Sequence, residues 1–301
     1  SRAIEIGRPV GVMVERFNGQ PFGMVLSHVE VPPPYSGDFV DSQMQIDAMG
    51  KITHVGTVDP MTMNPAAFDE LWKGLIHFGD LVKLNYKGPP YVLASVSSGI
   101  DPLRGYPITD GASTSDWYLQ TTLGQPPLLP PSPSGLTVPY QIIRQPVRSS
   151  TTPLQLPEGI VVDLVSSGMG AGGFWGIYTS NWSMPFDPIV LFDPSGRLAS
   201  VSQAPLGNPA APNDAVYLLL GRRDLMPDVT GTQIDRNLSE APLPAGTMMT
   251  PPPHFWVSIG YQTGLVTVAE VASNSQDPSM FALALEQARL FARQSQSVGG
   301  R

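Results

Sequence analysis

The chain has 301 residues, of which 42% are hydrophobic, and is long enough to bury a substantial core. Its formal net charge of −8 offers no basic surface for nucleic acid, and the absence of cysteine excludes thiol catalysis, zinc–thiolate sites and disulfides. Only 14% of the residues are charged, whereas 33 are proline and 30 are glycine, which favours a β-rich body with long loops over a helical bundle. No apolar run reaches about 18 residues, so no segment of this sequence is expected to span a membrane.

The first fifteen residues, SRAIEIGRPVGVMVE, are typical of the end of a helix that runs directly into a strand. Residues 2–6 suit a helix, Gly7 is the residue expected just after a helix C-terminus, and Pro9 cannot continue a helix. Valines alternate with other residues over 10–14, which predicts a strand. Because nucleation costs more than so few hydrogen bonds return, the short helix either packs on the body or is the end of a longer one.

The next part of the chain contains strand-like runs at 22–31 and 40–58, followed by one expected internal helix, NPAAFDELWKGLIHFG at 64–79. Asn64 is a good N-cap, Pro65 suits the first helical position and Gly79 ends the segment. The apolar residues between them follow helical spacing, which predicts a stripe that faces the core. From 89 to 139, clusters such as GQPPLLPPSPSG follow neither period, which predicts a Pro/Gly-rich surface insertion.

The C-terminal half is predicted to be an antiparallel meander, because short apolar or alternating runs there are bounded by turn residues. Asp193-Pro194-Ser195-Gly196 predicts a turn between two of these strands, and the stretch from Gly260 to Gly264 predicts another. We expect strands at 160–166, 189–192, 197–202, 214–220, 255–259 and 264–269. The expected core includes Phe68, Leu71, Trp72, Leu75, Val161, Leu191, Leu218 and Trp256.

A C-terminal helix is predicted over 277–294, with Asp277 as N-cap and Pro278 at the first position. Leu283 and Leu290, seven residues apart, fall among its polar residues; they are either isolated exposed leucines or contacts with another subunit, and we favour the second hypothesis. The face expected to dock on the body comprises Met280, Phe281, Ala284, Leu285, Ala288, Phe291 and Ala292, and the opposite face comprises Glu286, Gln287, Arg289, Arg293 and Gln294.

No motif in the sequence defines a catalytic, cofactor or metal site. The glycine-rich stretch 168–173 matches G-x-G-x-x-G, but the residues after it do not open a helix, so a loop is expected rather than a dinucleotide site. The four histidines (His28, His54, His77 and His254) show no metal-binding spacing, and no G-x-S-x-G nucleophile motif is present. We expect no catalytic residue and no cofactor.

Three further groups of residues have both a structural and a functional interpretation. The carboxylates Asp101, Asp110 and Asp116 are either solvated or calcium ligands, although their spacing fits no EF-hand. The sequons at Asn181 and Asn237 matter only in a glycosylating pathway. Loop aromatics either bury against a sheet or form a carbohydrate- or partner-binding surface; they are Trp117, Tyr118, Trp175, Tyr178 and Trp182.

The segment RAIEIGRPVGVMV resembles the helix–strand junction of type IV pilin-like proteins, particularly the H-type minor pseudopilins of type II secretion. TPLQLPEGIVVDL, PIVLFDPSGRLASVS and HFWVSIGYQTGLVTVAE are similar to later segments of that family, so the resemblance covers residues 1–17 and 154–270. It implies an α+β, β-rich fold. This would be a single pilin-like globular domain over 1–301, with an antiparallel sheet body, an N-terminal helix remnant, one internal helix and a C-terminal helix.

The resemblance implies a non-enzymatic structural subunit of a pilus, a pseudopilus or another cell-envelope filament, acting by self-assembly. Its partners would be further copies of itself or other pilin-like subunits, met through Ile4, Leu283 and Leu290. The protein would be periplasmic or extracellular, with membrane attachment only through a helix preceding Ser1. The alternative is a secreted β-rich binding module that uses exposed loop aromatics, and a hydrolase is the third possibility.

Overall fold

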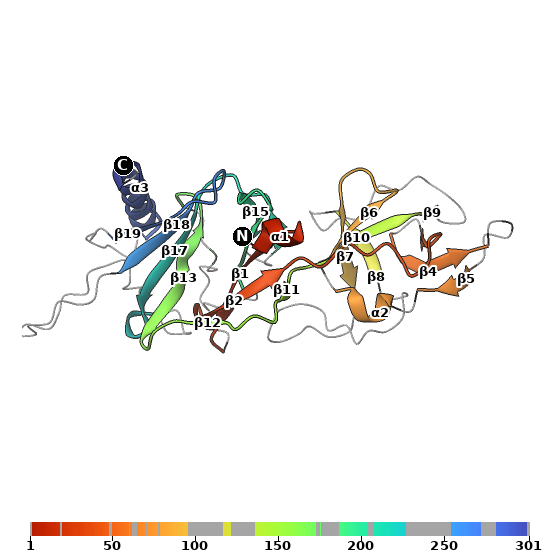
Figure 1. Ribbon diagram of the computed structural model, residues 1–301, viewed down its shortest axis with the longest axis horizontal. Coiled ribbons are helices and arrows are strands. Elements are labelled where there is room, and N and C mark those ends of the chain that lie inside the picture. The colour runs from red at the N-terminus through yellow and green to blue at the C-terminus, as the bar shows by residue number, and fades with distance from the viewer. Residues whose placement is uncertain are drawn as a thin grey trace, which may run out of the picture. The chain divides into compact units, whose positions relative to one another are not determined.

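The computed structural model describes residues 2–18, 20–47, 50–59, 61, 65–69, 71–77, 79–95, 117–121, 136–172, 175, 187–203, 208–226, 254–271 and 281–299 (Figure 1). The chain divides into two compact units, one formed by residues 1–30 and 148–301 and the other by residues 31–147. We expected a single domain carrying a surface insertion. The chain has two units instead because the second one builds a hydrophobic core of its own.

The first unit contains one antiparallel sheet, in the strand order β16-β15-β14-β1-β2-β13-β17-β18-β19. The short strand β12 (Leu154–Gln155) also pairs with β2, and β11 (Val147–Arg148) lies at the boundary of the units. The strands of the main order are β1 (Val10–Arg16), β2 (Phe22–Glu30), β13 (Ile160–Met169), β14 (Ile189–Phe192), β15 (Leu198–Gln203), β16 (Asn208–Ala210), β17 (Val216–Arg222), β18 (Phe255–Ile259) and β19 (Val266–Glu270). All six strands predicted for the C-terminal half are therefore confirmed, and their pairing is antiparallel.

Both predicted turns are present, and they lie against each other. Asp193 Oδ1 accepts hydrogen bonds from the backbone N–H of Ser195 (2.8 Å) and of Arg197 (3.1 Å), which closes the β14–β15 hairpin. The backbone N–H of Leu198 donates to Tyr261 O (3.3 Å), and a Cβ on Gly264 would overlap the carbonyl oxygen of Gly196. Because these hairpins are separated by four strands in the sheet order, the sheet must curl to bring them together.

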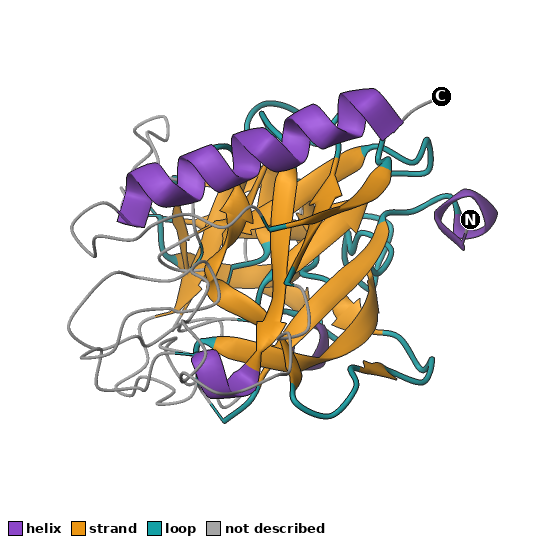
Figure 2. Ribbon diagram, turned by 90° about the vertical axis from the view of Figure 1, so that its left-hand side faces the viewer, coloured by secondary structure: helices purple, strands orange, loops and turns teal. Residues whose placement is uncertain are grey.

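The curled sheet has a core on each face. Val161 and Val162 illustrate the alternation, since adjacent residues of β13 enter different clusters. One face buries Val14, Val162, Leu164, Val190, Leu198, Val201, Val216 and Ile259. On the other face, helix α3 (Phe281–Gly299) lies across the strands (Figure 2) and adds Leu285, Ala288 and Ala292 to Phe22, Val161, Val165, Tyr217, Leu219 and Trp256. In the described part of this unit, the other helical segments are α1 (Arg2–Ile6) and the 3₁₀ turn Arg223–Leu225.

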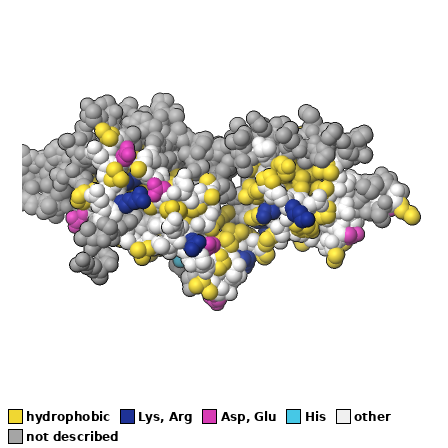
Figure 3. Space-filling view, turned by 90° about the horizontal axis from the view of Figure 1, so that it is seen from above, with side chains coloured by type: hydrophobic (Ala, Val, Ile, Leu, Met, Phe, Trp, Pro, Cys, Tyr) yellow, Lys and Arg dark blue, Asp and Glu magenta, His cyan; other side chains and the backbone are white. Residues whose placement is uncertain are grey.

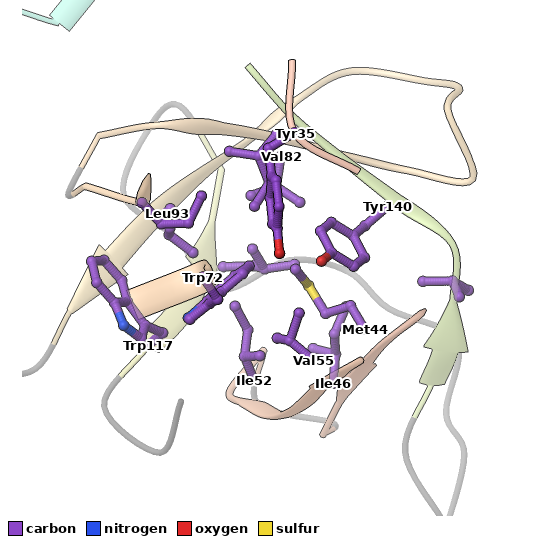
Figure 4. Close-up of a cluster of buried hydrophobic side chains, with 14 residues drawn as sticks. Tyr35, Met44, Ile46, Ile52, Val55, Trp72, Val82, Leu93, Trp117 and Tyr140 are labelled. Carbon is purple, nitrogen blue, oxygen red and sulfur yellow. The ribbon is translucent and has the colours of Figure 1, made fainter. Parts of the chain in front are cut away.

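The second unit consists of two four-stranded antiparallel sheets, with the strand orders β10-β6-β7-β8 and β5-β4-β3-β9. The strands are β3 (Gln43–Ile46), β4 (Ile52–Val58), β5 (Pro65–Phe68), β6 (Leu81–Leu84), β7 (Tyr91–Ser95), β8 (Trp117–Gln120), β9 (Leu136–Val138) and β10 (Tyr140–Ile143). Both sheets and the short helix α2 (Trp72–Leu75) contribute to one core, shown in Figure 4, which includes Met44, Ile46, Ile52, Trp72, Val82, Leu93 and Tyr140. Strands β7, β8 and β9 fall in the expected insertion 89–139, most of which lies outside the described residues.

The pilin-like arrangement implied by the resemblance is wrong. The structure is β-rich, as expected, but it has three antiparallel sheets, and its described residues show no pilin-like combination of helix and sheet. The reason lies in residues 31–147, whose apolar strand residues face one another across two sheets rather than joining the sheet of the first unit.

The predicted internal helix at 64–79 is also wrong. Its first part is strand β5, whose Phe68 pairs with Gly56 of β4, and only α2 is helical. Residues 65–68 form backbone hydrogen bonds with β4 instead of within a helix, and this tertiary pairing overrides the local helical spacing. Leu71, expected in the core, is therefore 58% exposed, whereas Trp72 is buried.

The other core predictions have mixed outcomes. Val161, Leu191 and Trp256 are buried, as expected. Leu75 and Leu218 are only partly buried, and each packs at the margin of its cluster. The side chain of Phe68 lies outside the described part of the structure.

Candidate interaction surface

Strand β13 contains a bulge, and helix α3 packs against it through Arg289. The register between β13 and β17 shifts between Asp163 and Gly168, so β13 has extra residues that pair with no residue of β17. The buried carboxylate of Asp163 holds this bulge, because its Oδ1 accepts from the backbone N–H of Val165 (2.9 Å) and of Ser166 (3.1 Å). Ser167 Oγ donates to Asp163 O and accepts from the N–H of Leu219 (2.9 Å).

Arg289 of α3 is fully buried against this bulge. Its Nη2 donates to Ser166 O (2.7 Å) and its Nη1 donates to Gly170 O (2.6 Å). The guanidinium carbon also lies 5.3 Å from the centroid of the Tyr217 ring and 5.5 Å from that of Trp256, within the range of cation–π attraction. Burial lowers the pKa of Arg289 to about 10, which leaves the side chain charged at neutral pH.

The assignment of Arg289 to the solvent face of the helix was wrong. At about 100° per residue, position 289 lies only about 40° around the helix from Leu285, which is on the buried face. Its polarity predicted exposure, but the fold brings it two acceptors, the carbonyl oxygens of Ser166 and Gly170, that no local pattern in the sequence reveals. Phe291 is the opposite error, because it lies about 120° from Leu285 and is 53% exposed instead of docked.

The outer face of α3 presents large apolar side chains. Leu283 is 48% exposed and Leu290 is 44% exposed, and both lie on the side of the helix opposite Leu285. Ile4, the third expected interface residue, is 65% exposed on α1, next to the buried Ala3. Exposure is what an interface requires of these three residues, and their role in one remains a prediction.

Strand β19 is a second place where apolar side chains are exposed. Val266 and Val268 of this strand are 54% and 64% exposed, and Leu265, just before it, is 64% exposed. In the face of the molecule drawn in Figure 3, apolar side chains likewise lie between scattered charged ones.

The second unit contains a buried polar cluster around Asp69. Asp69 Oδ2 accepts from Tyr140 Oη (2.6 Å), and Asp69 Oδ1 accepts from Ser42 Oγ (2.8 Å) and from the backbone N–H of Asp38 (3.2 Å). Tyr35 Oη donates to Asp38 Oδ1 (2.9 Å), and the Tyr35 and Tyr140 rings lie close together in Figure 4. Burial, reinforced by these carboxylates, raises the pKa of both tyrosines, so their hydroxyls remain donors. The cluster therefore joins segments of the fold that are distant in the sequence.

Asp80 has a comparable structural role beside strand β6. Its Oδ2 accepts from the N–H of His77 (2.8 Å) and its Oδ1 from the N–H of Gln145 (2.7 Å). Burial raises the pKa of Asp80 to about 6 in spite of these two donors.

The motif residues do not assemble into a site. Across the ranges that the structure describes, no group of three or more potential ligands from histidine, aspartate or glutamate could hold a metal ion. His28 lies on β2, His54 on β4, His77 after α2 and His254 before β18. The described part of the glycine-rich stretch, 168–172, is the end of β13 and a turn.

The aromatic residues proposed as a binding surface are mostly buried where they are described. Trp117 and Trp175 are 4% and 2% exposed, Tyr118 is half-buried, and Trp175 Nε1 donates to Ser202 O (2.7 Å). The remaining candidates lie outside the described residues: Tyr178, Trp182, the three aspartates Asp101, Asp110 and Asp116, and the sequons at Asn181 and Asn237.

Two structurally important residues were not singled out from the sequence, although one left a signal. Asp163 interrupts the apolar run GIVVDLV, and a lone carboxylate in a strand buried on both sides indicates a bulge or a network. Asp69 left no comparable signal, because it lies within the segment 64–79 that was expected to be a helix.

The comparisons with known proteins assign this chain to no family. No protein-family model, no curated protein and no solved structure matches this chain. Within the described ranges, no helix is long and apolar enough to cross a membrane.

Proposed function

We propose that this protein is a non-enzymatic structural subunit that acts by binding further copies of itself or other protein subunits. The observation that carries the proposal is the outer face of α3, where Leu283, Leu290 and Phe291 expose large apolar side chains within three turns of one helix. The proposal is broader than the pilus subunit implied by the resemblance, because the pilin-like arrangement is not what the described residues form.

The rigidity of α3 supports this function. Leu285, Ala288 and Ala292 are buried beneath the helix. Arg289 ties it to the carbonyl oxygens of Ser166 in β13 and of Gly170 just after this strand. A helix held in this way presents its outer leucines in a fixed position, so little conformational entropy is lost when a partner covers them.

The binding-module alternative receives less support. It requires exposed aromatic side chains in loops, and both tryptophans that the structure describes among its candidates are buried. Trp175 is also hydrogen-bonded to Ser202 O, which is the behaviour of a core residue.

The double variant Leu283→Ala, Leu290→Ala tests the proposal. Each leucine that a partner buries contributes about 1–2 kcal/mol, so the concentration needed for association should rise about 30-fold or more. Light scattering and filament counts by negative-stain electron microscopy measure this. The matched control is Leu154→Ala, because Leu154 is a similarly exposed leucine (60%) on β12.

The thermal midpoint of the double variant should stay at the wild-type value, because neither leucine is part of the core. Association that is unchanged in the double variant, or lowered equally by Leu154→Ala, would show that the outer face of α3 is not a contact surface.

A further inference from the structure

Among the strands that the structure describes, β19 lies at one edge of the sheet, with β18 as its neighbour. The N–H of Gly260 donates to Leu265 O (2.9 Å) and the N–H of Val271 donates to His254 O (2.9 Å). Together with the register, these two bonds determine which residues of β19 are hydrogen-bonded to β18. In an antiparallel pair, alternate residues exchange hydrogen bonds with the neighbour. Thr267 and Ala269 therefore bond to β18, and the residues between them, Val266, Val268 and Glu270, direct both backbone groups away from it.

The same three residues expose their side chains. Val266 is 54% exposed, Val268 is 64% exposed and Glu270 is also exposed, whereas Thr267 and Ala269 are half-buried. β19 contains no proline or lysine and its register with β18 is regular, so three features that prevent edge pairing (proline, lysine and a bulge) are absent from it; its one charged residue is Glu270. The strand at the other end of the sheet, β16, is only three residues long and contains Pro209, which has no N–H to donate.

We propose that a second copy of this chain pairs with β19 in antiparallel orientation about a two-fold axis at Val268. Three outward-facing residues suit this symmetry, because Val268 then pairs with its own copy and each Val266 pairs with the other copy's Glu270. The N–H and C=O groups of all three residues are satisfied by six hydrogen bonds between the copies. This contact deepens the proposed function, on which it rests, by naming a second copy as the occupant of the sheet edge.

The charges are compatible with this pairing. The two Glu270 side chains lie at opposite ends of the paired strands, about 13 Å apart along the strand direction. That separation exceeds the Debye length of about 8 Å at physiological ionic strength, so their repulsion is screened. A parallel pairing would instead place the two carboxylates side by side.

Single cysteine variants test the register, because the chain contains no cysteine of its own. In the proposed pair the two Val268 Cα atoms are about 5.5 Å apart, a distance that a disulfide spans. Val268→Cys should give a covalent dimer under mild oxidation, whereas Glu270→Cys, equally exposed on the same strand, should not. Absence of the dimer in Val268→Cys, or equal yields from both variants, would overturn the proposal.

Sedimentation of the full chain tests the contact without cross-linking. Val268→Pro removes an N–H that makes no hydrogen bond to β18, so the hairpin itself keeps its ladder. Because the change occurs in both copies, two of the six hydrogen bonds between them are lost, and the dissociation constant of the dimer should rise about 30-fold. Val268→Lys keeps the backbone donor and should weaken the dimer at least as much, because it brings two like charges together at the axis. A wild-type chain that stays monomeric at several hundred micromolar would contradict the pairing, as would a dimer that both variants leave intact.

The two association surfaces can be separated in the same experiments. Leu283→Ala with Leu290→Ala should leave the β19 cross-link unchanged, and Val268→Lys should leave the contribution of the α3 leucines unchanged. If the leucine double variant does not weaken association while the Val268→Cys cross-link still forms, the α3 proposal fails. If the cross-link does not form while the leucine double variant still weakens association, the β19 proposal fails.

Discussion

Replacing Arg289 with methionine should loosen helix α3 from the first unit by up to about 3 kcal/mol. The variant removes two hydrogen bonds from a charged donor, to Ser166 O (2.7 Å) and Gly170 O (2.6 Å), each of which contributes about 1.5–3 kcal/mol. Removing a buried charge offsets part of this loss, and the lowering of the pKa of Arg289 from 12.5 to about 10 corresponds to about 3 kcal/mol. A net cost remains because both acceptors are main-chain carbonyls, and that of Ser166 stays buried beneath the helix when its donor is removed.

Hydrogen exchange followed by mass spectrometry measures this effect in α3 separately from the second unit. A loss of up to about 3 kcal/mol should speed exchange of the α3 amides by up to about 150-fold. Exchange in residues 31–147 should not change, because that unit has its own core. Arg289→Lys should give an intermediate result, since one ammonium group does not reproduce the planar pair of donors.

The matched control for this prediction is Arg293→Met on the same helix. Arg293 is 60% exposed and its Nη1 lies 3.8 Å from Asp214 Oδ1, so its removal should change stability by less than about 0.5 kcal/mol. If Arg289→Met exchanges as slowly as the wild type, or no faster than Arg293→Met, the hydrogen bonds to the β13 bulge do not hold the helix.

Two further predictions concern single residues. Burial raises the pKa of Asp80 from 3.8 to about 6, so the folded protein binds more protons than the unfolded chain between about pH 4 and 6. Stability of the second unit should therefore fall by up to about 3 kcal/mol as the pH rises through that window and stay level above it, and urea titrations should show this component missing in Asp80→Asn. Gly264→Ala should lower the thermal midpoint more than Gly196→Ala. Both positions have positive φ (+63° and +88°), which strains any other residue. Only at Gly264, however, would the added Cβ overlap the backbone of another residue, Gly196. Equal midpoints for the two glycine variants would contradict the contact between the hairpins.

The meander of the first unit could be predicted from the sequence because its signals are local. Period-2 alternation and the turn residues from Asp193 to Gly196 act within a few positions of one another, and the structure places the strands and the hairpin where these signals predict. The C-terminal helix was predicted for the same reason. Its buried face at Leu285, Ala288 and Ala292 follows from helical spacing alone.

The internal helix was mispredicted because two local signals competed with a distant one. Helical spacing and an apparent N-cap at Asn64 favoured a helix, but pairing with β4 makes Pro65–Phe68 a strand, and Asp69 is used by Tyr140, 71 residues away in the sequence. No pattern within the segment encodes that partner. The division into two units was missed similarly, since which strands share a core depends on contacts between distant segments.

By itself, the sequence determined that this protein is β-rich, where its C-terminal strands and turns lie, and that its last helix has one apolar face. Only the tertiary structure decided that Arg289 is inside rather than outside, that Phe291 is exposed, and that β19 is an edge strand. Local conformation depends on spacing and turn chemistry that can be read along the chain. The burial of a polar group depends instead on whether the fold brings it a partner, and the exposure of a strand edge depends on which strands become neighbours. Both are set by segments that lie far apart in the sequence.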